Sequence, residues 1–205
     1  YTRIDQIMIK EELGNHEVGL YAASIKLVEI WYFIPTIIAT SFFPAIINSK
    51  DNKEIYYQRI NYLFGILIWK SLLIILLIYF FADNLILITY GENYIESVEI
   101  LKIHIWCLVF VAIGIVSSKW LISENLQKYS LYFTTSGAFT NIVLNSIFIS
   151  KYGTIGAAFS TLISFFVSSY LIQFFFRNTR YNFIRINNSF NLKQLIINIS
   201  KIKIY

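Results

Sequence analysis

The sequence predicts an all-α protein, a polytopic transmembrane helix bundle, and three observations support this fold class. Of the 205 residues, 57% are hydrophobic and only 14% are charged, whereas an average soluble domain is roughly 25% charged. The apolar residues also fall in blocks of about 20, the helix length that spans the hydrocarbon core of a bilayer. The chain has one cysteine, which excludes a disulfide scaffold and a thiolate zinc site.

We expect about five full transmembrane helices plus the end of a sixth. Residues 1–9 have the pattern of the last turns of a helix, and the next helix begins near Gly19 and extends to Ile47. The clearest block is 62–81, and further blocks cover 103–122, 129–149 and 153–176. Because no Met opens the chain and no signal peptide precedes these helices, we expect it to be the later part of a longer membrane protein.

Two prolines mark the helix that ends at Ile47. Pro35 and Pro44 each remove a backbone donor, which neighbours or water must compensate in lipid. The pattern predicts a long, kinked helix. Simple tolerance is the alternative, since proline is more frequent in transmembrane helices than in soluble ones.

The connecting segments predict the orientation. Segments 10–18, 82–102 and 150–152 would share one side of the membrane, and they hold three basic residues and seven acids. Segments 48–61, 123–128 and 177–205 would share the other side, with ten basic residues and three acids. Positive charge stays in the cytoplasm, so we expect the C-terminus to be cytoplasmic.

The chain divides into a transmembrane lobe, residues 1–176, and a basic cytoplasmic tail, residues 177–205. Within the tail, apolar residues from Leu192 to Ile202 recur at helical spacing, which predicts an amphipathic helix on the inner membrane surface; disorder is the alternative. Basic residues in such a tail interact with anionic lipid headgroups, each with roughly 1 kcal/mol. The net charge of +5 therefore does not indicate nucleic acid as a partner.

Charged residues inside the predicted helices are candidates for a substrate path. Lys70 lies eight residues from the start of its block and eleven from its end, where a lysine costs roughly 2.5–3.5 kcal/mol to insert. We expect it to face a water-filled cavity, and the structural alternative is an interhelical ion pair with Glu29 or Asp5.

The other charged candidates lie in the first two helices. Lys26 and Glu29 share a helix face, which favours a local ion pair and leaves open that both line a polar lumen. Arg3 and Asp5 point to roughly opposite faces, so each needs a different partner. Arg3, Lys26 and Lys70 outnumber Asp5 and Glu29, and a lumen with this bias would suit an anionic ligand.

Small and amide residues form two further patterns. Gly156, Ser160, Ser164 and Ser168 step by four, which predicts a smooth edge for close helix packing. Asn141 and Asn145 share a face of the preceding helix, where they would bond across helices or point into the cavity. His104 and Trp106, near a helix start, fit an interfacial belt.

Catalytic signatures are absent from the sequence. It contains no metal-spaced His/Cys/Asp cluster, no GxSxG motif, no phosphate-cradling glycine loop and no paired aspartates. We therefore expect neither an enzyme nor a protein that needs a metal or cofactor.

Several stretches resemble the bacterial polysaccharide (O-antigen) flippases of the multidrug/oligosaccharidyl-lipid/polysaccharide exporter superfamily. They are RIDQIMI at 3–9, LG at 13–14, EVGLYAA at 17–23, EIWYFIP at 29–35, and SFFP at 41–44 followed by Lys50. The stretches NIVLN at 141–145 and YGTIGAA at 152–158 are similar to the superfamily more widely. The resemblance extends to about Phe176.

The resemblance implies about twelve helices in two pseudo-symmetric lobes, of which this chain would be the second. Such flippases move undecaprenyl-pyrophosphate-linked oligosaccharide across the bacterial inner membrane by alternating access through a cationic lumen. Among the charged candidates, Arg3, Asp5 and Glu29 lie in matched stretches, whereas Lys70 depends on the physical argument alone. The implied partners are the lipid bilayer and the lipid-linked glycan, and polysaccharide polymerase and chain-length proteins are further candidates.

Two other functions stay open at this point. A drug or cation antiporter of the same superfamily would need acidic groups as proton or cation sites and a less cationic lumen. A membrane-embedded polysaccharide polymerase or transferase would need a long extracytoplasmic loop with catalytic residues, and the longest such segment predicted here is 82–102.

Overall fold

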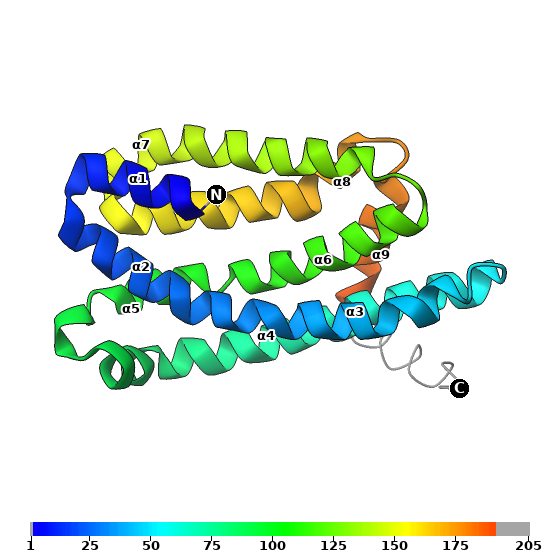
Figure 1. Ribbon diagram of the computed structural model, residues 1–205, viewed down its shortest axis with the longest axis horizontal. Helices are drawn as coiled ribbons and strands as arrows, with labels where there is room; N and C mark the ends of the chain where they lie inside the picture. The colour runs from blue at the N-terminus through cyan, green and yellow to red at the C-terminus, as the bar shows by residue number, and fades with distance from the viewer. Residues whose placement is uncertain (1, 192–205) are drawn as a thin grey trace.

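The structure is a computed structural model that describes residues 2–191. They form an elongated bundle whose long helices run roughly along one axis (Figure 1). No strand occurs among the described residues, so the predicted all-α class is confirmed. The helices are α1 (Thr2–Leu13), α2 (Asn15–Glu29), α3 (Phe33–Ile47), α4 (Lys53–Tyr90), α5 (Ser97–His104), α6 (Cys107–Ser123), α7 (Lys128–Phe166), α8 (Ile172–Phe175) and α9 (Arg180–Ser189).

Four helical stretches in residues 2–191 are long and apolar enough to cross a membrane: Asn15–Ile47, Lys53–Tyr90, Ser97–Ser123 and Lys128–Phe175. The last stretch reverses direction at Gly153, whose φ of 60° and ψ of −143° are not helical. Glycine adopts such a conformation at little cost because it has no Cβ. The two arms of α7 therefore run antiparallel (Figure 1), and this stretch supplies two of the five full helices that we predicted.

α4 is much longer than the predicted block 62–81. It spans 38 residues, or about 57 Å at 1.5 Å per residue, so the loops predicted at 48–61 and 82–102 are wrong over most of their length. Asn52 caps its start, and the side chain accepts hydrogen bonds from the backbone N–H groups of Glu54 and Ile55. Beyond its other end, α5 already begins at Ser97.

The helix that we expected to be long and kinked is α2 followed by α3. They are joined by a single 3₁₀ turn, Ile30–Tyr32. Pro35 explains this position, because proline has no N–H to bond the carbonyl four residues earlier and its ring crowds that carbonyl. Pro35 lies in the first turn of α3, whereas Pro44 lies in its interior.

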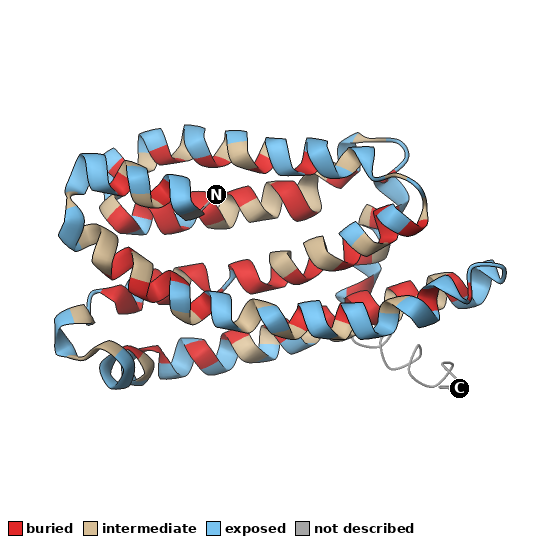
Figure 2. Cartoon of the chain, in the orientation of Figure 1, coloured by how far each residue is buried: buried red, intermediate tan, exposed pale blue. Residues whose placement is uncertain are grey.

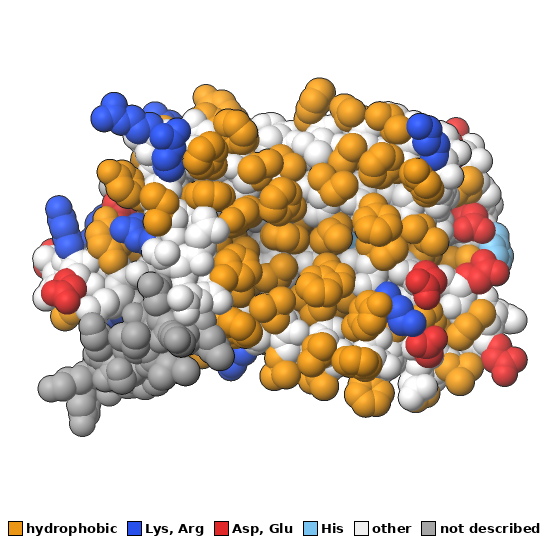
Figure 3. All heavy atoms as spheres, turned by 180° about the vertical axis from the view of Figure 1, so that it is seen from behind, with side chains coloured by type: hydrophobic (Ala, Val, Ile, Leu, Met, Phe, Trp, Pro, Cys, Tyr) orange, Lys and Arg blue, Asp and Glu red, His pale blue; other side chains and the backbone are white. Residues whose placement is uncertain are grey.

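The two ends of the bundle differ in charge. The turns at Gly14, at 91–96 and at Gly153 lie at one end, and the turns at 48–52, 124–127 and 176–179 lie at the other (Figure 1). Figure 3 shows Lys and Arg predominating at one end, Asp and Glu at the other, and hydrophobic side chains over the middle of that face. This distribution matches a helix bundle set in a membrane.

Two apolar clusters form the interior, and Figure 2 colours the buried residues of the bundle red. The larger lies mainly between α4 and α6 and contains Phe64 and Ile113, both fully buried. The smaller joins α1, α2, α5 and α7 through residues such as Tyr21 and Ile149. Reciprocal hydrogen bonds also fasten α2 to α5: Ser24 Oγ donates to the carbonyl of Ser97 at 2.7 Å, and Ser97 Oγ donates to the carbonyl of Leu20 at 2.9 Å.

α9 occupies part of the segment that we predicted as a tail. It buries Asn182 and Ile186, and Ser189 Oγ donates to the carbonyl of Asn61 in α4 at 3.4 Å. Its axis crosses the direction of the long helices (Figure 1). The amphipathic helix predicted from Leu192 onward lies outside the described residues.

Gly156 provides a test of the packing between the two arms of α7. A Cβ added there would lie 2.1 Å from the backbone oxygen of Phe148, whereas a Cβ added at Gly19 in α2 meets nothing within 4 Å. Gly156→Ala should therefore destabilise the fold by about 1–3 kcal/mol, the usual cost of overpacking. Gly19→Ala is the matched control and should be neutral or slightly stabilising. Thermal unfolding of both variants in detergent measures the difference, and equal midpoints would contradict the described packing.

Candidate functional site

A completely buried carboxylate, Asp5, lies where α1, α2 and both arms of α7 meet. Tyr21 Oη donates to Asp5 Oδ2 at 2.9 Å, and Thr161 Oγ1 donates to the same oxygen at 2.6 Å. Asn145 Nδ2 donates to Asp5 Oδ1 at 2.5 Å. Asp5 is the only Asp, Glu, Lys or Arg that is buried among the residues with described burial, 3–191.

Asn141 extends this network along α7. Asn145 Nδ2 donates a second bond to Asn141 Oδ1 at 3.2 Å, and Asn141 Nδ2 donates to Thr161 Oγ1 at 3.3 Å. The side-chain oxygen of Asn145, Oδ1, is buried and has no hydrogen-bond partner among the described residues. We call Asp5, Tyr21, Asn141, Asn145 and Thr161 the Asp5 network.

Helix geometry explains why these side chains meet. Asn141 and Asn145 are four residues apart and so share one face of the first arm of α7. The reversal at Gly153 brings Thr161, on the second arm, back opposite them. The smaller apolar cluster surrounds the network with residues such as Ile9, Ile25 and Ala157, which keeps water away from the carboxylate.

The network can hold a positive charge. A buried carboxylate is costly unless it is paired and hydrogen-bonded, and here only neutral groups compensate it. Its carboxylate, amide and hydroxyl oxygens are the ligand types that hard cations prefer, and Asn145 Oδ1 is a spare acceptor. Either a proton or a small cation at Asp5 would neutralise the site. Among residues 2–191, no group of three His, Cys, Asp or Glu could hold a metal.

His104 lies beside the network. Its ring is fully buried and packs edge-on against Tyr21, with 6.2 Å between ring centroids. Neither ring nitrogen has a hydrogen-bond partner. The interfacial position that we predicted for His104 is therefore wrong, because α5 turns this residue into the bundle, whereas Trp106 is 43% exposed.

The remaining charged candidates lie on the surface of the lobe. Arg3, Lys26, Glu29 and Lys70 are all exposed. The ion pair expected between Lys26 and Glu29 is absent, and Lys70 pairs with neither Glu29 nor Asp5, since the ion pairs within residues 2–191 join only His16–Glu17, Lys102–Asp83 and Lys102–Glu99. Asp5 instead takes its partners from neutral side chains.

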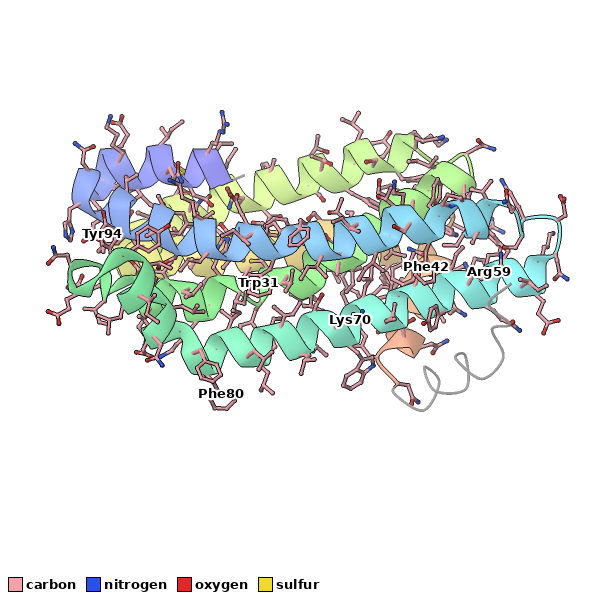
Figure 4. All side chains as sticks on the ribbon, turned by 60° about the horizontal axis from the view of Figure 1, so that its bottom comes forward. Trp31, Phe42, Arg59, Lys70, Phe80 and Tyr94 are labelled. Carbon is pink, nitrogen blue, oxygen red and sulfur yellow. The ribbon has the colours of Figure 1, made fainter. Side chains whose placement is uncertain are left out.

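Lys70 lies near the middle of α4 (Figure 4). It is 17 residues after Lys53 and 20 before Tyr90, or about 26 and 30 Å from the two ends at 1.5 Å per residue. On the same helix, Phe80 is 71% exposed and points away from the bundle (Figure 4). Lys70 thus combines exposure, central depth and the absence of an ion-pair partner in the described part of the chain.

Arg3 and Lys26 lie at similar depth. Arg3 is eleven residues before the turn at Gly14 and Lys26 is twelve after it, which places both about 16–18 Å from that turn at 1.5 Å per residue. α1 ends and α2 begins at this turn, and the two helices pack against each other through the smaller apolar cluster. The two cations therefore occupy one level of the lobe.

The predicted packing edge is buried along its whole length. Ser160 Oγ and Ser164 Oγ each donate to the carbonyl four residues earlier, at 2.9 and 2.6 Å. Gly156 faces the backbone of Phe148. Ser168 differs from the other three, because it borders a cavity of about 230 Å³ that is also lined by Ser117 and Thr134.

A second buried polar cluster was not predicted. Gln173 Nε2 donates to Ser117 Oγ at 3.0 Å, and Asn182 Nδ2 donates to Gln173 Oε1 at 2.7 Å. Both amides are fully buried. They adjoin a π-helical turn, Val167–Leu171, and connect α6, α8 and α9 at the basic end of the bundle.

Comparison with known proteins finds relatives whose names refer to the transport or biosynthesis of glycans and polysaccharides. A putative O-antigen transporter of Shigella flexneri is 24% identical over 84% of this chain and 41% of its own length. A probable low-salt glycan biosynthesis flippase of Haloferax volcanii is 23% identical over 83% of this chain and 37% of its own length. A capsular polysaccharide biosynthesis protein of Staphylococcus aureus is 24% identical over 86% of this chain and 45% of its own length.

The chain spans about two fifths of the length of these relatives. No solved structure gave a significant match. The MatE family model matches residues 1–147, which include α1 to α6 and most of the first arm of α7. The helical architecture and the family match agree, and the chain belongs to the MatE family of membrane proteins.

Proposed function

We propose that this chain is the second lobe of a flippase that moves undecaprenyl-pyrophosphate-linked oligosaccharide across the bacterial inner membrane by alternating access. The observation that carries the proposal is the set of exposed cations Arg3, Lys26 and Lys70, none of which has an ion-pair partner within residues 2–191. Facing lipid, such cations would be costly. Facing a lumen shared with a first lobe, they would attract the pyrophosphate of the substrate.

The charge difference between the two ends of the bundle supports the proposed orientation. The basic end of the bundle, with the C-terminal segment, faces the cytoplasm. The substrate enters from that side, its glycan is held in the lumen and its prenyl chain stays in lipid. Polysaccharide polymerase and chain-length proteins would act on the delivered repeat units.

We assign ion coupling to the Asp5 network. Loading of a proton or cation at Asp5 would remove the only buried acidic charge among residues 3–191, the charge that ties α1 and α2 to both arms of α7. Its release would restore the hydrogen bonds to Tyr21, Thr161 and Asn145. The occupancy of this site therefore biases how these helices pack, which is the requirement for coupling an ion gradient to a change of access.

A drug or cation antiporter of the same family is the second candidate, and the buried acid Asp5 favours it. The exposed cations disfavour it, because a cationic drug would be repelled by the same lumen. A polymerase or transferase gains no support from the described residues, since most of the segment 82–102 is helical and leaves little room for a catalytic loop. We therefore infer a transporter rather than an enzyme.

Lys70→Ala tests the cationic lumen. In a bacterium that lacks its own O-antigen flippase and makes a matched glycan, the wild-type gene should restore surface polysaccharide. Lys70→Ala should reduce it at least about tenfold, as loss of one charge-assisted phosphate contact predicts, and Lys70→Arg should keep most of it. Lys53→Ala, an exposed lysine at the first residue of α4, at the basic end of the bundle, is the matched control.

Membrane abundance of each variant is measured alongside. Equal surface polysaccharide with Lys70→Ala and wild type would remove Lys70 from the substrate path. Failure of the wild type at normal abundance would reject the flippase, and protection against toxic cations in the same strain would support the antiporter.

Asp5→Asn tests the coupling role. The substitution keeps the shape of the side chain but removes its charge, so the protein should reach the membrane while transport becomes at least about tenfold slower and insensitive to the driving gradient. Glu12→Gln, an exposed acid on the same helix, should behave as wild type. Transport in vesicles with imposed proton or sodium gradients measures this, and unchanged gradient dependence in Asp5→Asn would contradict the assignment.

A further inference from the structure

A pocket of about 330 Å³ with both polar and apolar lining residues lies at the basic end of the bundle, away from the Asp5 network and from Lys70. The residues that line it are Tyr57 from α4, Trp120 from α6, Glu124 and Leu126 from the following turn, Asn178 before α9, and Tyr181 and Arg185 from α9. Its volume is in the range of small-molecule sites. Its three aromatic residues are of the types that gather at membrane–water interfaces.

Two opposite charges line this pocket without neutralising each other. Glu124 and Arg185 form no ion pair, since the ion pairs within residues 2–191 involve neither residue. A tyrosine side chain contacts each of these two charged groups. Tyr56 Oη donates to Glu124 Oε1 at 2.7 Å, and the Arg185 guanidinium lies 3.7 Å from the centroid of the Tyr57 ring.

The position of the pocket brings it to the level of lipid headgroups. The apolar helix α6 ends at Ser123, directly before Glu124. α9 crosses the direction of the long helices (Figure 1) and exposes Tyr181 (70%) and Ile184 (49%) while burying Ile186. A helix with exposed apolar residues in this orientation suits the interface plane of a membrane.

We propose that this pocket binds the headgroup of phosphatidylethanolamine. This headgroup carries an ammonium and a phosphate, which match the two unneutralised side chains. The ammonium donates to the Glu124 carboxylate, and the phosphate accepts from the Arg185 guanidinium, whose flat face rests on Tyr57 and whose N–H edge is available. Asn178 and Tyr181 supply further polar atoms, and the acyl chains extend along the apolar surface. The bound lipid fastens α9 to α4 and the end of α6, whatever the protein transports.

Lipid retention by the intact protein tests this inference. Wild-type protein in mild detergent is offered phosphatidylethanolamine, phosphatidylglycerol or phosphatidylcholine, and the bound lipid is counted by native mass spectrometry. We expect phosphatidylethanolamine to be retained about tenfold better than the other two, because only it carries both an anion and an ammonium that donates hydrogen bonds. Equal retention of all three, or preference for phosphatidylglycerol, would overturn the proposal without any variant.

Two variants test which part of the lipid headgroup Glu124 and Arg185 each bind. Glu124→Gln should abolish the preference for phosphatidylethanolamine over phosphatidylglycerol, whereas Arg185→Gln should weaken retention of both. Glu54→Gln and Arg177→Gln, exposed charges at the same end that do not line the pocket, are matched controls and should keep the wild-type preference. Monodisperse elution establishes that each variant is folded. A wild-type preference in folded Glu124→Gln and Arg185→Gln would contradict the assigned roles.

Discussion

The hydrogen bonds that compensate one buried carboxylate constrain much of this lobe. Asp5 takes its partners from α2 and from both arms of α7, so none of these segments can shift without exposing or stranding a charge. The reversal at Gly153 is necessary to bring Thr161 opposite Asn145, and the apolar cluster around them excludes water. The site therefore links three parts of the lobe through a group whose charge an ion can change.

The surface charges complement this interior. Basic residues predominate at one end of the bundle and acidic residues at the other, and hydrophobic side chains cover the middle of the face in Figure 3. Arg3, Lys26 and Lys70 are exposed away from the ends of the bundle, and they have no ion-pair partners within residues 2–191. A membrane protein tolerates such groups where water or another lobe covers them, and this is why we propose that Arg3, Lys26 and Lys70 line the lumen.

The sequence predicted the helical class well, because blocks of about 20 apolar residues have few other structures open to them. It misplaced the ends of α4, since the polar residues at 53–61 and 82–90 continue the helix beyond the apolar block. Asp5, Asn141 and Asn145 were recognised as polar groups in apolar surroundings, but their meeting with Tyr21 and Thr161 depends on the turn at Gly153 and on packing between distant helices. Tyr21 and Thr161 gave little signal of their own, because both residue types are common in transmembrane helices. The expected Lys26–Glu29 ion pair is absent because helix spacing alone does not fix side-chain partners, and the alternative of an ion pair for Lys70 is not seen within residues 2–191 either.

The most direct measurement of the central claim is the water accessibility of position 70 in the membrane. The native Cys107 is buried, so wild-type protein should react little with a membrane-impermeant thiol reagent and gives a low background. Lys70→Cys should be labelled in intact membranes, whereas Phe80→Cys, on the outward side of the same helix, should stay unlabelled in lipid. Labelling of position 70 that changes when lipid-linked glycan is supplied would support a substrate lumen, and absence of labelling at position 70 in folded protein would contradict it.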